Sequence, residues 1–186
     1  MINEYADDTH REQAEEFIMA LGRFVLAFER VCDAMRYIIM FTLRSQGLKN
    51  QGMEQVLIGD KASAELQGLL GALYCEIPGQ DDEDKKHVKA LLKSIKEITE
   101  KRNILLHSSW NLGSKAAAAD EELYAATVRY RLKQNTVSGA EVHGFSASYI
   151  CELSSELNRI QILLQRLQYC ITQNNFKIAK EFAKPM

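Results

Sequence analysis

Two stretches of this chain repeat apolar residues at alternating spacings of three and four, and this repeat restricts the possible folds more than any other feature. The first repeat is Phe17, Leu21, Phe24, Phe28, Val31, Met35 and Ile38, and the second is Ile150, Leu153, Leu157, Ile160, Leu164, Leu167 and Ile171. Because an α-helix has 3.6 residues per turn, this spacing places the apolar side chains on one helical face. The chain contains only two prolines, Pro78 and Pro185. We therefore predict a mainly all-α fold, an antiparallel bundle with long helices.

Start and stop signals divide the chain into further helices. Thr9 and Glu12 form a capping box for the first helix, and Ser146 or Ser148 caps the last one. The acidic run from Asp81 to Asp84 favours a helix N-terminus. Helices are expected at about 9–45, 53–57 and 60–76, from the acidic run at 81–84 to the segment 102–107, and from the cap at Ser146 or Ser148 to about Ile171. We expect the tail after Asn174 to be loosely held.

The period changes to two in the segment at about 124–145, which predicts a small β-hairpin insertion. Its first strand alternates apolar residues with Arg129, Arg131 and Lys133, and its turn is expected near Asn135 or Ser138-Gly139. The three basic residues on one face predict an RNA-binding row. A solvated strand edge that discourages aggregation is the other interpretation of the same row.

Length and charge narrow the class of protein. The chain has 186 residues and a formal charge of -2, so we expect a single domain over 1–186 and no coating of nucleic acid by bulk positive charge. Its four cysteines are far apart and indicate reduced core thiols. The acidic start, with Glu4, Asp7 and Asp8, and the absence of a long apolar run predict a cytoplasmic protein that does not enter a membrane.

Arg102 occupies a position where the helical pattern predicts an apolar residue. The stripe of that helix is Val88, Leu91, Ile95, Ile98, Arg102 and Leu105. A buried guanidinium without a partner costs several kcal/mol, so this arginine requires an acid, a ligand or a position where the stripe meets solvent. One interpretation is a structural ion pair, for which Glu29 is a possible partner.

Asn103 and His107 follow Arg102 and suggest a second interpretation, a site for chemistry on a phosphodiester. Arginine binds phosphate with a fork of donors, and histidine exchanges protons near neutral pH. At about 100° per residue, however, Arg102 and His107 point roughly 140° apart on a regular helix. A shared site therefore requires a helix that ends at Leu106, or a two-fold dimer. The wide apolar flank of the first helix, formed by Ile18, Val25, Cys32 and Ile39, independently suggests a second copy.

The segment from Arg102 to His107 resembles the motif of the HEPN superfamily: an arginine, a polar residue directly after it, three further residues, and a histidine. Members are helical domains, and many are RNases of toxin-antitoxin, abortive-infection and RNA-surveillance systems. The resemblance implies metal-independent RNA cleavage at a homodimer interface by Arg102, Asn103 and His107. It also implies an antitoxin or inhibitor protein as a possible partner. Some related toxins carry a tyrosine shortly after the histidine, where this chain has Trp110.

The three side chains have chemistry that suits these roles. His107 can act as general base on a ribose 2'-hydroxyl or as general acid to the leaving oxygen, and Arg102 can neutralise charge on the phosphorane. Asn103 would orient one of them, and the product would carry a 2',3'-cyclic phosphate. We predict no metal and no cofactor, because neither a paired metal-ligand pattern nor a nucleotide-binding glycine loop is present. The alternative is a non-catalytic helical module that serves as a regulator, adaptor or nucleotide sensor.

Overall fold

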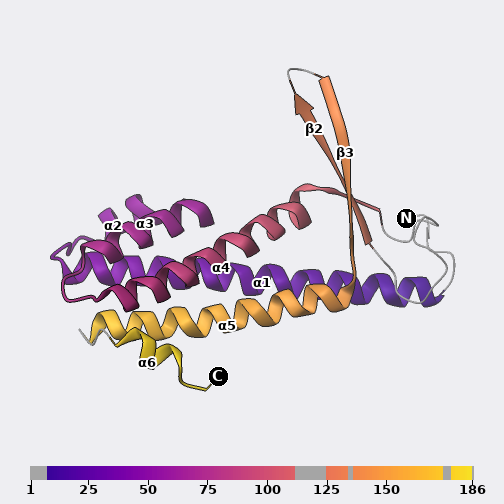
Figure 1. The fold of residues 1–186 in the computed structure, drawn as a ribbon. Coiled ribbons are helices and arrows are strands. Elements are labelled where there is room, and N and C mark those ends of the chain that lie inside the picture. The colour runs from indigo at the N-terminus through magenta and orange to yellow at the C-terminus, as the bar shows by residue number, and fades with distance from the viewer. Residues whose placement is uncertain (1–7, 112–124, 134–135, 174–176, 186) are drawn as a thin grey trace. The chain divides into compact units, whose positions relative to one another are not determined.

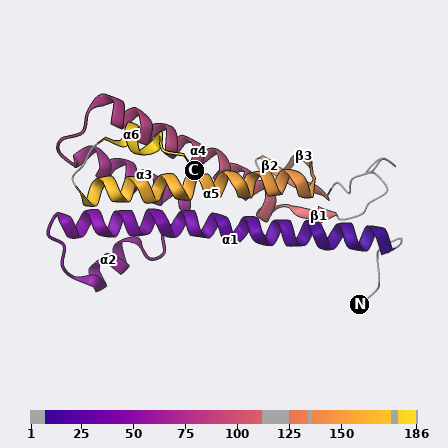
Figure 2. The same cartoon turned by 90° about the horizontal axis from the view of Figure 1, so that it is seen from below.

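Six helices and three short strands make up the part of the chain that the computed structural model describes, which is residues 8–111, 125–133, 136–173 and 177–185. Figures 1 and 2 show these elements in two views. The prediction of a mainly α fold is confirmed. The helices are α1 (Asp8–Ser45), α2 (Gln51–Ile58), α3 (Ser63–Glu76), α4 (Asp82–His107), α5 (Ala147–Thr172) and α6 (Ile178–Phe182).

The strands form one antiparallel sheet in the order β1-β2-β3. Their bounds are β1 (Ser109–Asn111), β2 (Ala125–Lys133) and β3 (Thr136–Phe145). Lys133 pairs with Thr136, and Ser138 and Gly139 belong to β3, so the turn predicted at Ser138-Gly139 is wrong. The register shifts between Arg131 and Leu132. Two parts of the predicted insertion, Tyr124 and the turn residue Asn135, lie outside the described residues.

The contacts between residues separate the chain into two compact units. The first comprises residues 1–26 and 100–155, and the second comprises 27–99 and 156–186. The first unit contains the predicted catalytic segment and the strands, and the second contains α2, α3 and α6.

Local capping explains where three of the helices begin. Asn50 Oδ1 accepts from Met53 N at the start of α2, and Asp81 Oδ1 accepts from Asp84 N at the start of α4. The predicted cap of α5 is confirmed at Ser146, whose Oγ accepts from Tyr149 N at 3.2 Å. Asp8, the first residue that the structure describes, and Thr9 both lie within α1, so the expected cap at Thr9 is wrong.

The predicted apolar stripes form the buried core of each unit. In the first unit the buried residues include Ala14, Phe17, Phe24, Leu105, Ile150 and Leu153. In the second they include Met35, Ile38, Leu66, Leu70, Ile95, Leu157, Leu164 and Leu167. The wide apolar flank of α1 is only partly buried: Cys32 and Ile39 are buried, whereas Ile18 is 52% exposed.

Polar contacts fix the two shortest helices of the second unit. The Arg44 guanidinium donates to both carboxylate oxygens of Glu54 at 2.7 Å, which joins α1 to α2 and lowers the pKa of Glu54. Asp84 Oδ1 accepts from Ile178 N at 2.9 Å at the start of α6. Ile178 is fully buried, so the expectation of a loosely held tail is wrong for α6. Residues 174–176 lie outside the described residues.

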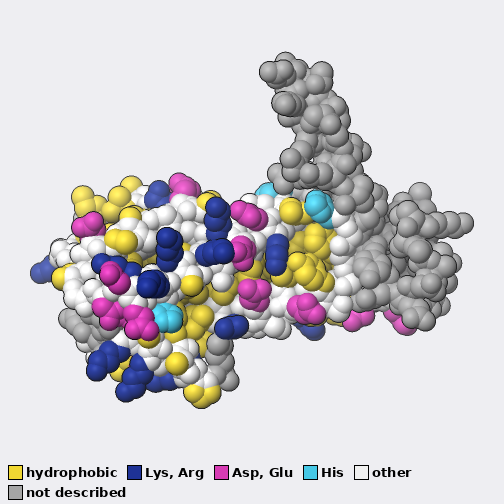
Figure 3. All heavy atoms as spheres, viewed as in Figure 1, with side chains coloured by type: hydrophobic (Ala, Val, Ile, Leu, Met, Phe, Trp, Pro, Cys, Tyr) yellow, Lys and Arg dark blue, Asp and Glu magenta, His cyan; other side chains and the backbone are white. Residues whose placement is uncertain are grey.

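The surface carries mixed charge. On the face drawn in Figure 3, Lys and Arg side chains are interspersed with Asp and Glu side chains over the described residues. None of the helices in the described ranges has both the length and the apolar character needed to cross a membrane.

Candidate functional site

The predicted catalytic residues occupy the last turns of α4. Arg102 and Asn103 are half-buried and His107 is exposed, whereas Ile98 and Leu105, the neighbours of Arg102 on the apolar stripe, are buried. Arg102 is therefore a half-buried cation between two buried apolar residues.

The structure brings Arg102, Asn103 and His107 into contact. Arg102 Nη1 donates to Asn103 Oδ1 at 3.2 Å and lies 3.2 Å from His107 Nε2. Helix α4 includes His107, so the first of the two alternative conditions for a shared site, a helix that ends at Leu106, is not met. The angle of 140° applies to the directions in which the two side chains start from the backbone. The long arginine side chain then extends along the helix surface to the imidazole. A single chain is therefore sufficient to bring Arg102 and His107 together.

The contact between these two groups suits one tautomer of the imidazole. A guanidinium has five N–H donors and no acceptor, so His107 Nε2 accepts from Arg102 Nη1 only in the tautomer that carries its proton on Nδ1. A neutral imidazole with a lone pair on Nε2 is the form that can accept a proton from a hydroxyl group.

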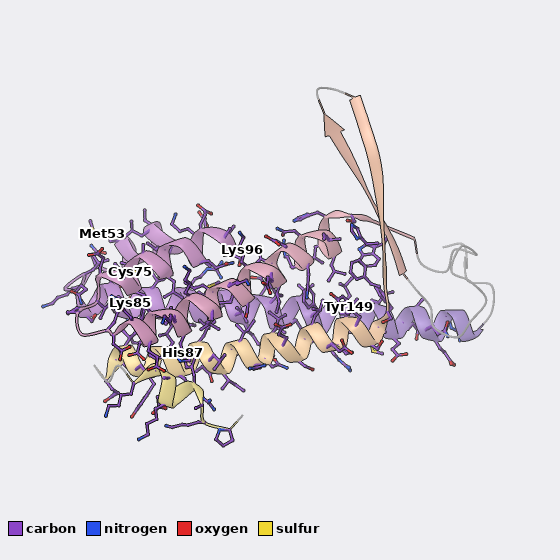
Figure 4. The ribbon with its side chains drawn as sticks, in the orientation of Figure 1. Met53, Cys75, Lys85, His87, Lys96 and Tyr149 are labelled. Atoms are coloured by element: carbon purple, nitrogen blue, oxygen red, sulfur yellow. The ribbon has the colours of Figure 1, made fainter. Side chains whose placement is uncertain are left out.

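Aromatic residues that the sequence did not point to lie in the same unit as His107. Trp110 Nε1 donates to Leu105 O at 2.7 Å, and the Trp110 ring contacts Phe17 and Phe145 at centroid distances of 5.1 and 6.0 Å. Phe145 stacks on Tyr149 at 5.9 Å, and Lys101 Nζ lies 5.9 Å from the Tyr149 centroid. Tyr149 lies at the start of α5 (Figure 4). The only sequence signal for this cluster was the position of Trp110, three residues after His107.

The predicted RNA-binding residues Arg129, Arg131 and Lys133 lie in β2, outside α4. In the ladder they pair with Glu141, Gly139 and Thr136. Arg129 thus stands opposite an acidic residue. The structure does not describe the surroundings of these side chains, so their RNA contact stays a prediction.

Other groups with potential chemistry have structural roles or no partners. The described residues contain no group of three or more His, Cys, Asp and Glu side chains that could hold a metal ion. His87 contacts the Phe182 ring at 6.1 Å. All four cysteines are free thiols, but only Cys32 and Cys170 are buried, so the expectation of core thiols is wrong for Cys75 and Cys151.

A separate cavity of about 380 Å³ lies in the second unit between α4, α5 and α6. Its lining includes His87, Ser94, Glu156, Arg159 and Phe182. None of the predicted catalytic residues lines this cavity.

The chain was also compared with known proteins. No protein-family model, no curated protein and no solved structure matches it.

Proposed function

We propose that this chain is a metal-independent endoribonuclease of the cytoplasm, with Arg102, Asn103 and His107 at the reacting phosphodiester. The observation that carries the proposal is the 3.2 Å contact between Arg102 Nη1 and His107 Nε2 at the exposed end of α4. It pairs a permanent cation, suited to phosphate, with an imidazole, a group suited to exchange a proton with a hydroxyl. The motif resemblance supports the same assignment.

The reaction begins when a phosphate group competes for the Arg102 guanidinium. His107 Nε2 is then released and accepts the proton of the neighbouring ribose 2'-hydroxyl, whose oxygen forms a bond to phosphorus. The bond from phosphorus to the 5'-oxygen breaks, and that oxygen takes a proton from a general acid. Arg102 stabilises the charge on the phosphorane, and Asn103 orients Arg102 through its Oδ1. The products are a 2',3'-cyclic phosphate and a free 5'-hydroxyl.

A homodimer would supply the general acid. In a two-fold assembly, one His107 removes the 2'-hydroxyl proton while His107 of the second copy protonates the leaving oxygen. Exposed apolar side chains on α1 in the unit that contains His107, among them Ile18 and Leu26, support self-association. Sedimentation velocity of the purified protein tests the dimer.

Cleavage in the presence of a chelator tests the reaction. Purified protein is incubated with RNA and EDTA, and fragment ends are identified by mass spectrometry. We expect cyclic phosphate ends from the wild type and from His87→Ala, a matched histidine variant in the second unit. His107→Ala should lose at least about 10²-fold in rate, the usual contribution of a general acid or base. Equal cleavage by wild type and His107→Ala, or none by either, would instead indicate a non-catalytic helical module.

A further inference from the structure

The aromatic cluster of the first unit differs from an ordinary packed core in its exposure. Trp110, Phe145 and Tyr149 are all half-buried, whereas Phe17 and Phe24 of the same unit are almost completely buried. Successive ring centroids from Trp110 to Phe145 to Tyr149 are 6.0 and 5.9 Å apart. The three rings thus form a continuous row, and none of the three residues is completely buried.

A cation completes this row. Lys101 Nζ lies 5.9 Å from the centroid of the Tyr149 ring, and Lys101 precedes Arg102 in α4. Partly exposed aromatic rings beside a lysine are a combination that binds single-stranded nucleic acid, because a base stacks on a ring while the cation attracts the backbone. In a duplex the bases stack on one another, which covers their faces and prevents stacking on a protein side chain.

One chain neighbour and one hydrogen bond connect the row to the predicted catalytic residues. Lys101 is adjacent to Arg102 in the chain, and Trp110 Nε1 donates to the carbonyl of Leu105, between Arg102 and His107. The rings are consequently held against the same helical turns that carry the predicted chemistry.

We propose that Trp110, Phe145 and Tyr149, together with Lys101, bind an unpaired base of single-stranded RNA that flanks the phosphodiester at Arg102. This inference rests on the proposed function, and it specifies the substrate: unpaired RNA is bound and cut, and duplex RNA is not. Tyr149 is a positioning residue in this scheme, because it contacts the base and not the reacting atoms.

The test uses the only tryptophan of the chain, Trp110, as a fluorescent reporter. A short single-stranded RNA is titrated into the His107→Ala protein, which retains the rings, and the same sequence is titrated as a duplex. We expect the single strand to quench Trp110 fluorescence and the duplex to bind at least about 10-fold more weakly. Equal quenching by both RNAs, or quenching by neither, would overturn the proposal.

Variants of Tyr149 test the stacking itself. Tyr149→Leu should weaken single-strand binding about 5- to 100-fold, and Tyr149→Phe should restore it, because phenylalanine keeps the ring. The matched control is Tyr169→Leu, since Tyr169 is also on α5, is 51% exposed and lies in the second unit. Unchanged binding by Tyr149→Leu would contradict the proposal.

The two proposals fail in different ways. If single-stranded RNA quenches Trp110 fluorescence but the wild type cleaves no RNA, the base-binding proposal stands and the ribonuclease proposal is wrong. If chelator-resistant cleavage is the same for Tyr149→Leu as for the wild type, and the same for duplex as for single-stranded RNA, the ribonuclease proposal stands and the base-binding proposal is wrong.

Discussion

The guanidinium of Arg102 has five N–H donors in a planar fork, and its contacts with Asn103 Oδ1 and His107 Nε2 are both made through Nη1. Lysine carries the same charge on a compact ammonium group and lacks this planar fork. Replacing Arg102 with lysine therefore keeps the charge and changes only the shape of the donor group.

Arg102→Lys tests that property. We expect the catalytic rate on RNA to fall about 10²- to 10³-fold, because an ammonium cannot donate in parallel to two phosphoryl oxygens. The rate is measured with excess substrate and EDTA. The control is Lys96→Arg, a surface exchange on α4 in the second unit that should leave the rate unchanged. Full activity of Arg102→Lys would mean that charge alone suffices.

Two buried thiols should make the stability of the second unit fall at alkaline pH. Burial, together with the nearby Glu29, raises the pKa of Cys32 from 9.0 to about 11, and burial with nearby Glu181 raises that of Cys170 to about 11. The unfolded chain loses these protons first. Their contribution to stability is thus complete below pH 9.0 and is lost as the pH rises to about 11.

Cys32→Ala should reduce this loss of stability at high pH. The measurement is the urea midpoint at about pH 8 and at about pH 10.5, which lie on either side of the unfolded thiol's titration. The midpoint of the wild type should fall more between these two conditions than that of Cys32→Ala. Cys151→Ala removes an exposed thiol and serves as the control. An identical fall in all three proteins would refute the role of the Cys32 thiol.

At the scale of the element, α6 depends on a carboxylate distant in sequence. Asp84 is 2% exposed, and its Oδ1 accepts from Ile178 N and, at 3.4 Å, from Ala179 N. Arg166 donates to the carbonyls of Glu181 and Lys184 at the other end of the segment. A helix of five residues is too short to be stable alone, so these contacts and the buried Ile178 hold it in place.

Asp84→Ala should therefore destabilise the second unit by about 1–3 kcal/mol, the cost of leaving buried donors without an acceptor. Asp84→Asn keeps an oxygen acceptor at Oδ1 and should cost less. Urea unfolding measures both variants, and amide exchange at Ile178 and Ala179 locates the effect. If alanine and asparagine were equally tolerated, the carboxylate would not be the anchor of α6.

Elements with local signals were predictable from the sequence, and elements that depend on distant partners were not. The repeat from Ile150 to Ile171 and the cap at Ser146 are properties of neighbouring residues, and both describe α5 correctly. Helix α6 and strand β1 are short. The start of α6 is hydrogen-bonded to Asp84, and β1 pairs with β2. Such partners become neighbours only after folding.

The same distinction applies to the candidate site. The sequence placed Arg102, Asn103 and His107 in one segment, but helical angles alone predicted that Arg102 and His107 would not meet. The reach of a flexible side chain decided that question. The aromatic row combines Trp110 with Phe145 and Tyr149, which are more than thirty residues away in the chain, and no local pattern connects them.

At the scale of the whole molecule, the charge distribution limits how RNA can be bound. The formal charge is -2, and acidic and basic side chains alternate over the face shown in Figure 3. Without a large positive field, affinity for RNA has to come from a few local contacts and from stacking. This distribution agrees with a site built from one arginine, one lysine and a row of rings.

The hydrogen bond from Trp110 Nε1 to Leu105 O bears on which part of the protein unfolds first on heating. The last carbonyls of a helix have no partner within it, and here a side chain beyond the helix end supplies one. The turn that carries His107 therefore frays when the indole loosens, before the long helices melt. Trp110→Phe should abolish the proposed RNA cleavage at a temperature well below the unfolding midpoint, as residual activity and calorimetry on the same heated samples would reveal. Coincident inactivation and melting would mean that the end of α4 is stable without the indole.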